Sequence, residues 1–289
     1  MNSLLEKITE WIKEALIGGI TTNFTGMFDM VNQKVGEIAG QVGQTPESFN
    51  SGVFSMIRSL SETVVIPIAG MILTFILCYE LITMIIDRNN MHDFETWIFF
   101  KWFFKTACAV MIVSNTWNII MAVFDMAQSV VNSAAGVIVS DTSIDINSVI
   151  ADLEPRLMEM EIGPLLGMWF QSLFVSFSMQ VLSVCIFVIV YGRMIEVYLV
   201  TSVAPIPMST MMNKEWGSMG QNYLRSLFAL GFQAFLIIVC VGIYAVLVQS
   251  IAVESDLTLA IWTCIGYTVL LCFTLFKSSG LAKAVFNSH

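Results

Sequence analysis

Charged residues are scarce in this chain of 289 residues. They make up 12% of the sequence, against 56% for apolar residues, and the mean hydropathy is +0.78. A soluble domain carries about 25% charged residues, so this chain has too few to solvate the surface of a large soluble helical protein. The scarcity of charge favours a protein whose main solvent is the lipid bilayer.

Histidine is almost absent, and the cysteines do not have the spacing of a metal or redox site. The chain has two histidines and six cysteines, and every cysteine falls inside an apolar stretch. No two cysteines are separated by two residues, as zinc ligands and redox dithiols often are. We therefore expect no metal, no cofactor and no disulfide, and we expect the cysteines to act as small apolar side chains. They are Cys78, Cys108, Cys185, Cys240, Cys264 and Cys272.

Motifs for nucleotide hydrolysis and for covalent catalysis are also missing. The sequence contains no Gly-Lys-Ser/Thr phosphate loop and no Gly-x-Ser-x-Gly elbow. Its 19 methionines lack accompanying histidine or cysteine at ligand spacing, so flexible packing explains them better than copper binding. We predict that the protein is not an enzyme, and that any energy from a nucleotide is supplied by another protein.

What the chain does have is a set of long apolar stretches. An apolar stretch of about 18 or more residues predicts a transmembrane helix, because backbone groups in hydrocarbon must bond to one another. We therefore predict an all-α polytopic membrane protein with about five transmembrane helices and an N-terminal amphipathic helical region. The five stretches are residues 64–86, 99–124, 164–191, 224–251 and 257–276.

The chain divides into an N-terminal region, residues 1–50, and a membrane domain, residues 51–289. Apolar residues at helical spacing in 4–16 predict an amphipathic helix, which would lie in the membrane interface, against a partner or against its own subunit. The longest connections of the membrane domain are residues 125–163 and 193–223. The apolar segment 194–203 is too short to cross the membrane, so we expect a helical extension or an interfacial segment.

Basic residues are distributed unevenly between the two sides of this topology. Lysine and arginine are enriched in cytoplasmic loops. One side would hold eight basic and five acidic residues, and the other would hold five basic and sixteen acidic residues. We therefore place the C-terminus and connection 193–223 in the cytoplasm, and the N-terminus and connection 125–163 outside.

A few charged residues lie within or at the ends of the predicted spans. Charges at this depth are costly and are functional candidates by default. Glu80 lies near the inner end of the first span, and the short connection brings it close enough to pair with Lys101 or Lys105. Such a pair is either a polar or proton-responsive lining, or a structural ion pair with lysines that extend to the interface. Arg193 and Glu196, at i and i+3, can pair locally and mark the cytoplasmic boundary.

The turn before the fourth span carries the most specific sequence. It consists of Val203-Ala204-Pro205-Ile206-Pro207-Met208, and Asn213-Lys214-Glu215-Trp216-Gly217 follows shortly after. Together with five spans, an exported N-terminal region and a long outside connection, this turn resembles the VirB6/TrbL family of type IV secretion and conjugation subunits. The resemblance covers nearly the whole chain and is strongest to TrbL-like proteins on mobile elements of Gram-positive bacteria.

This resemblance implies a channel or scaffold that assists DNA–protein transfer across the cytoplasmic membrane of a bacterium. It also implies partners: membrane lipids, further copies in a homo-oligomeric ring, other secretion subunits including ATPases, and single-stranded DNA in transit. The residues that would shape the cytoplasmic contact surface are Pro205, Pro207, Lys214, Trp216 and Gly217. Because single-stranded DNA favours basic surfaces, the acidic outside part either keeps DNA from sticking or faces away from it.

Two other functions remain open on the sequence alone. A secondary transporter or small-solute channel would use Glu80 and the proline-broken segment 194–208 as a substrate site, since broken helices mark such sites. Two features argue against a transporter: the proline break in segment 194–208 lies at the cytoplasmic edge, and no internal repeat is visible. A holin-like or toxin-associated pore is the third possibility.

The topology makes a direct prediction about the two ends of the chain. With an odd number of crossings, tags at Met1 and His289 lie on opposite faces of the membrane. Protease added to intact spheroplasts should remove the N-terminal tag and spare the C-terminal one. Two tags protected on the same side would overturn both the topology and the secretion assignment.

Overall fold

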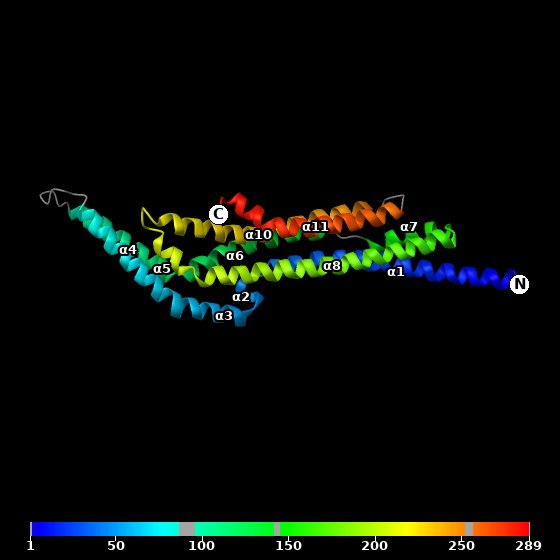
Figure 1. Cartoon of the computed structure of the whole chain (residues 1–289), viewed down its shortest axis with the longest axis horizontal. Coiled ribbons are helices and arrows are strands. Elements are labelled where there is room, and N and C mark those ends of the chain that lie inside the picture. The colour runs from blue at the N-terminus through cyan, green and yellow to red at the C-terminus, as the bar shows by residue number, and fades with distance from the viewer. Residues whose placement is uncertain (1, 87–95, 142–144, 252–256, 289) are drawn as a thin grey trace. The chain divides into compact units, whose positions relative to one another are not determined.

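Helices make up nearly all of the part that the computed structural model describes, which is residues 2–86, 96–141, 145–251 and 257–288. The predicted all-α class is therefore confirmed. The predicted charged connection 87–95, which includes Arg88 and His92, lies outside the described residues, as do Met1 and His289. The helices in Figure 1 are α1 (Asn2–Val42), α2 (Pro46–Phe49), α3 (Ser51–Leu60), the π-helical turn η1 (Ser61–Val65), α4 (Ile66–Ile86), α5 (Thr96–Ser114), α6 (Thr116–Asp141), α7 (Ile146–Met158), α8 (Ile162–Ser202), α9 (Pro205–Thr210), α10 (Gly217–Ile251) and α11 (Leu257–Val285).

Five helical segments in the described residues are long and apolar enough to cross a membrane, as predicted. Four of them match predicted stretches: Ser51–Ile86, Ile162–Ser202, Gly217–Ile251 and Thr258–Val285. Segment 194–203 is a helical extension rather than an interfacial segment, because α8 runs without a break to Ser202. At 1.5 Å per residue, α8 is roughly 60 Å long, about twice the thickness of the hydrocarbon core.

The second span differs from the predicted stretch 99–124. The segment long and apolar enough to cross is Thr116–Ile138, and the predicted stretch is divided between α5 and α6. At the junction, the backbone N–H and the side-chain amide of Asn115 both donate to the carbonyl of Met111, at 3.0 and 2.9 Å. A side-chain amide that competes for a helical carbonyl disturbs the helix at that turn. Residues 126–139, assigned to the long connection, belong to α6, and α7 follows within the same connection.

The chain forms two compact units. The first unit consists of Met1–Gly43, Val131–Tyr191 and Phe235–Ser278. The second unit consists of Gln44–Val130, Gly192–Ala234 and Ser279–His289. Each unit therefore has its own core, built from segments that are distant in sequence.

In the first unit, α1 packs on its own subunit along most of its length. The Asn23 amide donates to the Ser172 hydroxyl of α8 at 2.8 Å, and the Met27 sulfur lies 3.2 Å from the Cys264 sulfur of α11. Near its N-terminus, however, α1 leaves Leu4, Ile8 and Trp11 exposed. The later part of α1 therefore follows one sequence expectation, packing on its own subunit, while the first turns present an apolar face with no cover in the described chain.

The core of the second unit joins α3, α6, the end of α8 and the start of α10. Phe54 and Trp117 meet edge to face with ring centroids 5.2 Å apart, and Ile120 and Leu227 are fully buried beside them. The hydroxyl of Tyr198 donates to the carbonyl of Pro46 at 2.6 Å. This bond ties the short helix α2 to α8, and so fixes where the chain enters α3.

The helices α4 and α5 form a hairpin within the second unit, and they lie side by side in Figure 1. A small core of Ala69, Leu73, Ala109 and Val113 holds them together. Before the hairpin, η1 interrupts the α-helix, and the Ile66 N–H donates five residues back to Ser61. Pro67 follows directly and has no N–H to donate, which is a common cause of such an irregular turn.

The short helix α9 packs against α4, α5 and the start of α10. Two glycines of α10 allow this close approach. A methyl group at Gly220 would lie 2.7 Å from the Pro207 carbonyl oxygen and 2.9 Å from Met211 Cα, and one at Gly217 would lie 2.9 Å from the Met211 carbonyl oxygen. Because these neighbours are backbone atoms, they cannot move aside as a flexible side chain would.

We expect Gly220→Ala to destabilise the protein by about 1–3 kcal/mol, the usual effect of forcing extra atoms into a packed site. The matched control is Gly36→Ala in α1, where a methyl group would meet nothing within 4 Å. There the substitution should stabilise the helix by about 1 kcal/mol. Thermal unfolding of both variants in detergent micelles checks the contrast, and equal midpoints would contradict the packing of α9 on α10.

Candidate functional site

The acid in the first span and a lysine of the second helix form an ion pair, as the sequence suggested. The Lys105 ammonium donates to Glu80 Oε1, and the two side chains are 23% and 22% exposed. Lys101, the other predicted partner, is exposed. The hairpin places Glu80 and Lys105 opposite each other because α4 and α5 pack directly on one another.

The second oxygen of the same carboxylate is not satisfied. Glu80 Oε2 is buried without a hydrogen-bond partner among the described residues, and so are Trp102 Nε1 and Thr106 Oγ1 of α5. A buried polar atom without a partner costs free energy, so such atoms point to an unseen ligand, water or functional role. Three of them on the α4–α5 hairpin mark this region as more than apolar packing.

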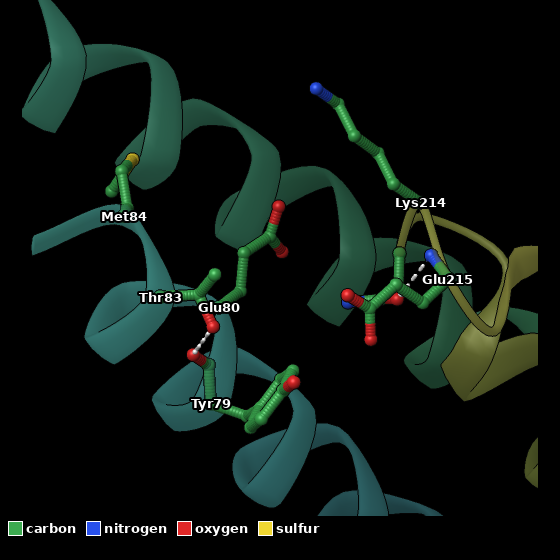
Figure 2. Close-up of a pocket in the computed structure, with 7 residues that line it drawn as sticks. Tyr79, Glu80, Thr83, Met84, Lys214 and Glu215 are labelled. Atoms are coloured by element: carbon green, nitrogen blue, oxygen red, sulfur yellow. Dashed lines mark hydrogen bonds between the residues drawn. The ribbon is translucent and has the colours of Figure 1, made fainter. Parts of the chain in front are cut away.

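A cavity of about 280 Å³ opens beside Glu80. Its walls come from α4 and from the turn between α9 and α10, which face each other in Figure 2. Besides Glu80, the lining residues are Tyr79, Thr83, Met84, Asn213, Lys214 and Glu215. The structure thus brings together two groups of residues that the sequence analysis treated separately: the intramembrane acid and the proposed cytoplasmic contact.

The α9–α10 turn is held in place from both sides. The Asn213 side-chain oxygen accepts from the N–H groups of Glu215 and Trp216, at 2.8 and 3.0 Å. The Trp216 ring stacks on Phe75 of α4, with ring centroids 6.0 Å apart. These contacts fix the backbone from which the Lys214 and Glu215 side chains project into the cavity wall.

Arg193 and Glu196, which their spacing allows to pair locally, each contact a residue of a later helix. Arg193, which is buried, donates from Nε to the Leu230 carbonyl at 3.2 Å, and Glu196 pairs with Lys283 of α11 at 3.2 Å. The fold thus gives each side chain a tertiary contact, from α10 or from α11, besides the local neighbour that the i, i+3 spacing provides. These contacts join α8 to both later helices.

The residues proposed as a cytoplasmic contact differ in exposure. Pro205 and Gly217 are buried and Pro207 is half-buried, whereas Lys214 and Trp216 are exposed. The buried residues therefore shape the turn from inside, and the exposed ones are available to another molecule. Sequence reasoning named Asn213 only as part of the turn, and it missed Tyr79 and Thr83, because ordinary polar residues give no signal until the fold brings them to one cavity.

The charged groups of this cavity are of kinds that can bind a small molecule. The described residues contain no cluster of three or more side chains suited to hold a metal ion. The cavity presents one buried acceptor, one exposed carboxylate and one ammonium group. Such a mixture can hold a small group that carries both charges.

Comparison with known families decides what kind of protein contains this site. Residues 31–205, more than half of the chain, match the family described as TrbL/VirB6 plasmid conjugal transfer like protein. The chain belongs to the TrbL/VirB6 family. The matched region includes Glu80, Lys105 and Arg193, but it ends before Lys214 and Trp216. No curated protein and no solved structure matches the chain.

Within this TrbL/VirB6 protein, we expect the Glu80–Lys105 pair to be energetically coupled. Glu80→Gln or Lys105→Met alone should destabilise by about 1–3 kcal/mol, because each leaves a partly buried group unpaired. The double variant should lose less stability than the sum of the losses in the two single variants. Unfolding midpoints in micelles measure this cycle.

The exposed pair of Arg58 and Glu62 provides the matched control for this cycle. Its Nε–Oε1 distance is 2.8 Å, but its side chains are 51% and 44% exposed. Exposed pairs at i, i+4 contribute only about 0.3–0.5 kcal/mol. Strictly additive effects at Glu80 and Lys105 would show that their contact contributes nothing.

Proposed function

We propose that the protein is a channel or scaffold subunit of a conjugative type IV secretion apparatus in the cytoplasmic membrane of a bacterium. The observation that carries this proposal is the family match over residues 31–205, which contains three of the five membrane-crossing segments. Its role is to assist the passage of a DNA–protein substrate, with energy supplied by partner ATPases. The chain itself is not an enzyme in this proposal.

The orientation that fits this role places the C-terminus inside and the N-terminus outside. The bias of lysine and arginine supports it. Both segments then assigned to the cytoplasm, residues 193–223 and the C-terminal end, belong to the second unit. A folded turn with exposed Lys214 and Trp216 offers a defined surface for a partner ATPase on that side.

Assembly of several copies is the second part of the proposal. Only about a third of the most apolar 18-residue stretch of α8 is buried, and the same fraction is buried in α11. Large apolar side chains such as Phe177, Val184 and Phe187 remain exposed along α8. These faces are available to lipid and to neighbouring copies in a ring around the substrate path.

Deletion of the gene from a donor strain should reduce conjugation to background, and the wild-type gene in trans should restore it. Lys214→Glu should lower transfer while the protein level in the membrane stays unchanged, because it reverses charge on the proposed ATPase contact. Lys7→Glu, at an exposed lysine near the start of α1, is the matched charge reversal and should transfer normally. Normal transfer by the deletion strain would exclude the proposed function.

Size measurement in mild detergent tests the ring. We expect a particle several times the 32.2 kDa mass of one chain. A strictly monomeric particle would count against the ring and leave the conjugation phenotype as a separate question. Solute uptake by purified protein in liposomes, abolished by Glu80→Gln, would instead favour the transporter alternative.

A further inference from the structure

The cavity beside Glu80 contains one buried acceptor without a partner and two exposed charged groups. Glu80 Oε2 is the buried acceptor that lacks a donor among the described residues. Lys214 and Glu215 also line the cavity and are exposed, so both are accessible to an occupant. An occupant that satisfies all three must supply a hydrogen-bond donor with positive charge for the two carboxylates and a negatively charged acceptor for the lysine.

The cavity lies where an apolar helix ends. Glu80 is in the last two turns of α4, within the membrane-crossing segment Ser51–Ile86. Tyr79 of α4 and Trp216 of the facing turn are 44% and 42% exposed. Tyrosine and tryptophan are enriched at the level of lipid headgroups, where their rings contact both apolar and polar surroundings. The aromatic residues therefore place this cavity at the headgroup level of the bilayer.

The outer surface of the hairpin around the cavity is apolar. Phe100, Phe103 and Phe104 of α5 are all more than 60% exposed, as is Ile86 at the end of α4. A molecule that occupies the cavity from the membrane side therefore has an apolar body next to this surface and a charged group inside. This combination describes a phospholipid.

We propose that the cavity binds the headgroup of a phospholipid with a primary ammonium group, of the phosphatidylethanolamine class. The ammonium donates to Glu80 Oε2 and to the Glu215 carboxylate, and the phosphate accepts from Lys214. A quaternary ammonium has no N–H to donate, and a purely anionic headgroup brings no positive charge to the Glu215 carboxylate or to Glu80 Oε2. The volume of about 280 Å³ is just below the 300–1,000 Å³ typical of drug-sized ligands, so it suits a small polar group.

A basic side chain of a protein partner is the main competing occupant. It satisfies the carboxylates but repels Lys214. The lipid headgroup carries both charges, so its phosphate accepts from Lys214 while its ammonium donates to the carboxylates.

Lipid binding to the purified full-length protein in micelles tests the proposal without reference to DNA transfer. Native mass spectrometry with short-chain phosphatidylethanolamine, phosphatidylcholine and phosphatidylglycerol should show about tenfold preference for the first, the effect of one charge-assisted hydrogen bond. Free phosphoethanolamine, added as a competitor, distinguishes a lipid site from a soluble-ligand site. We expect it to displace the lipid only weakly, because it lacks the apolar body.

Exposed positions provide variants that should not disturb folding. Glu215→Gln should weaken phosphatidylethanolamine binding several-fold and reduce the preference over phosphatidylcholine. Lys214→Ala should weaken the binding of both lipids several-fold and keep the preference, because both lipids carry the phosphate that Lys214 binds. Glu62→Gln, an exposed carboxylate at the other end of the same crossing segment, is the matched control and should bind normally. Glu80→Gln should abolish the preference in any preparation that remains folded.

Several results would overturn the proposal. These are equal binding of the three lipids, a preference for phosphatidylglycerol, full preference in Glu215→Gln, or unchanged lipid affinity in Lys214→Ala. Tighter binding of free phosphoethanolamine than of the lipid would assign the site to a soluble ligand. Displacement of the lipid by a short lysine-rich peptide, with unchanged binding of that peptide to Lys214→Ala, would assign it to a protein partner.

Discussion

A charge carried into a membrane-spanning helix has to find its partner inside the protein, because no water is present at that depth. This constraint accounts for two of the most informative contacts of the chain. Glu80 pairs with Lys105 across the hairpin, and buried Arg193 donates to the Leu230 carbonyl. The more exposed pair of Glu196 and Lys283 adds a third contact. Each contact joins two different helices, so each of these polar groups also fixes the arrangement of its neighbours.

The sequence predicted the helical class and four of the five crossings, because apolar stretches longer than a bilayer need no tertiary information. It failed at the second crossing for a specific reason. Apolar residues continue on both sides of Asn115, so hydropathy cannot show that the helix is disturbed there and that the crossing segment begins at Thr116. Similarly, the continuity of α1 to Val42 depends on packing against α8 and α11, which periodicity does not report.

The candidate site was predictable only in part. Glu80 and Lys105 were identified because ionisable residues in apolar stretches are rare, and rarity is a signal in itself. Tyr79 and Thr83 were not, because each is ordinary in its own segment. Arg193 and Glu196 are instructive, since spacing along one helix shows only a local neighbour while the fold supplies Leu230 and Lys283. Local rules give the residues that need partners, and only packing decides which partners they obtain.

The turn between α9 and α10 links the membrane interior to the proposed cytoplasmic surface. Trp216 stacks on Phe75 of α4, and Gly217 and Gly220 allow α10 to lie directly against α9, which itself packs on the hairpin. The same turn supplies Lys214 and Glu215 to the cavity wall. A displacement of this turn must therefore separate Trp216 from Phe75 and open the cavity beside Glu80. A partner that contacts Lys214 and Trp216 and a lipid bound in the cavity consequently act on one element, so each should alter the affinity for the other.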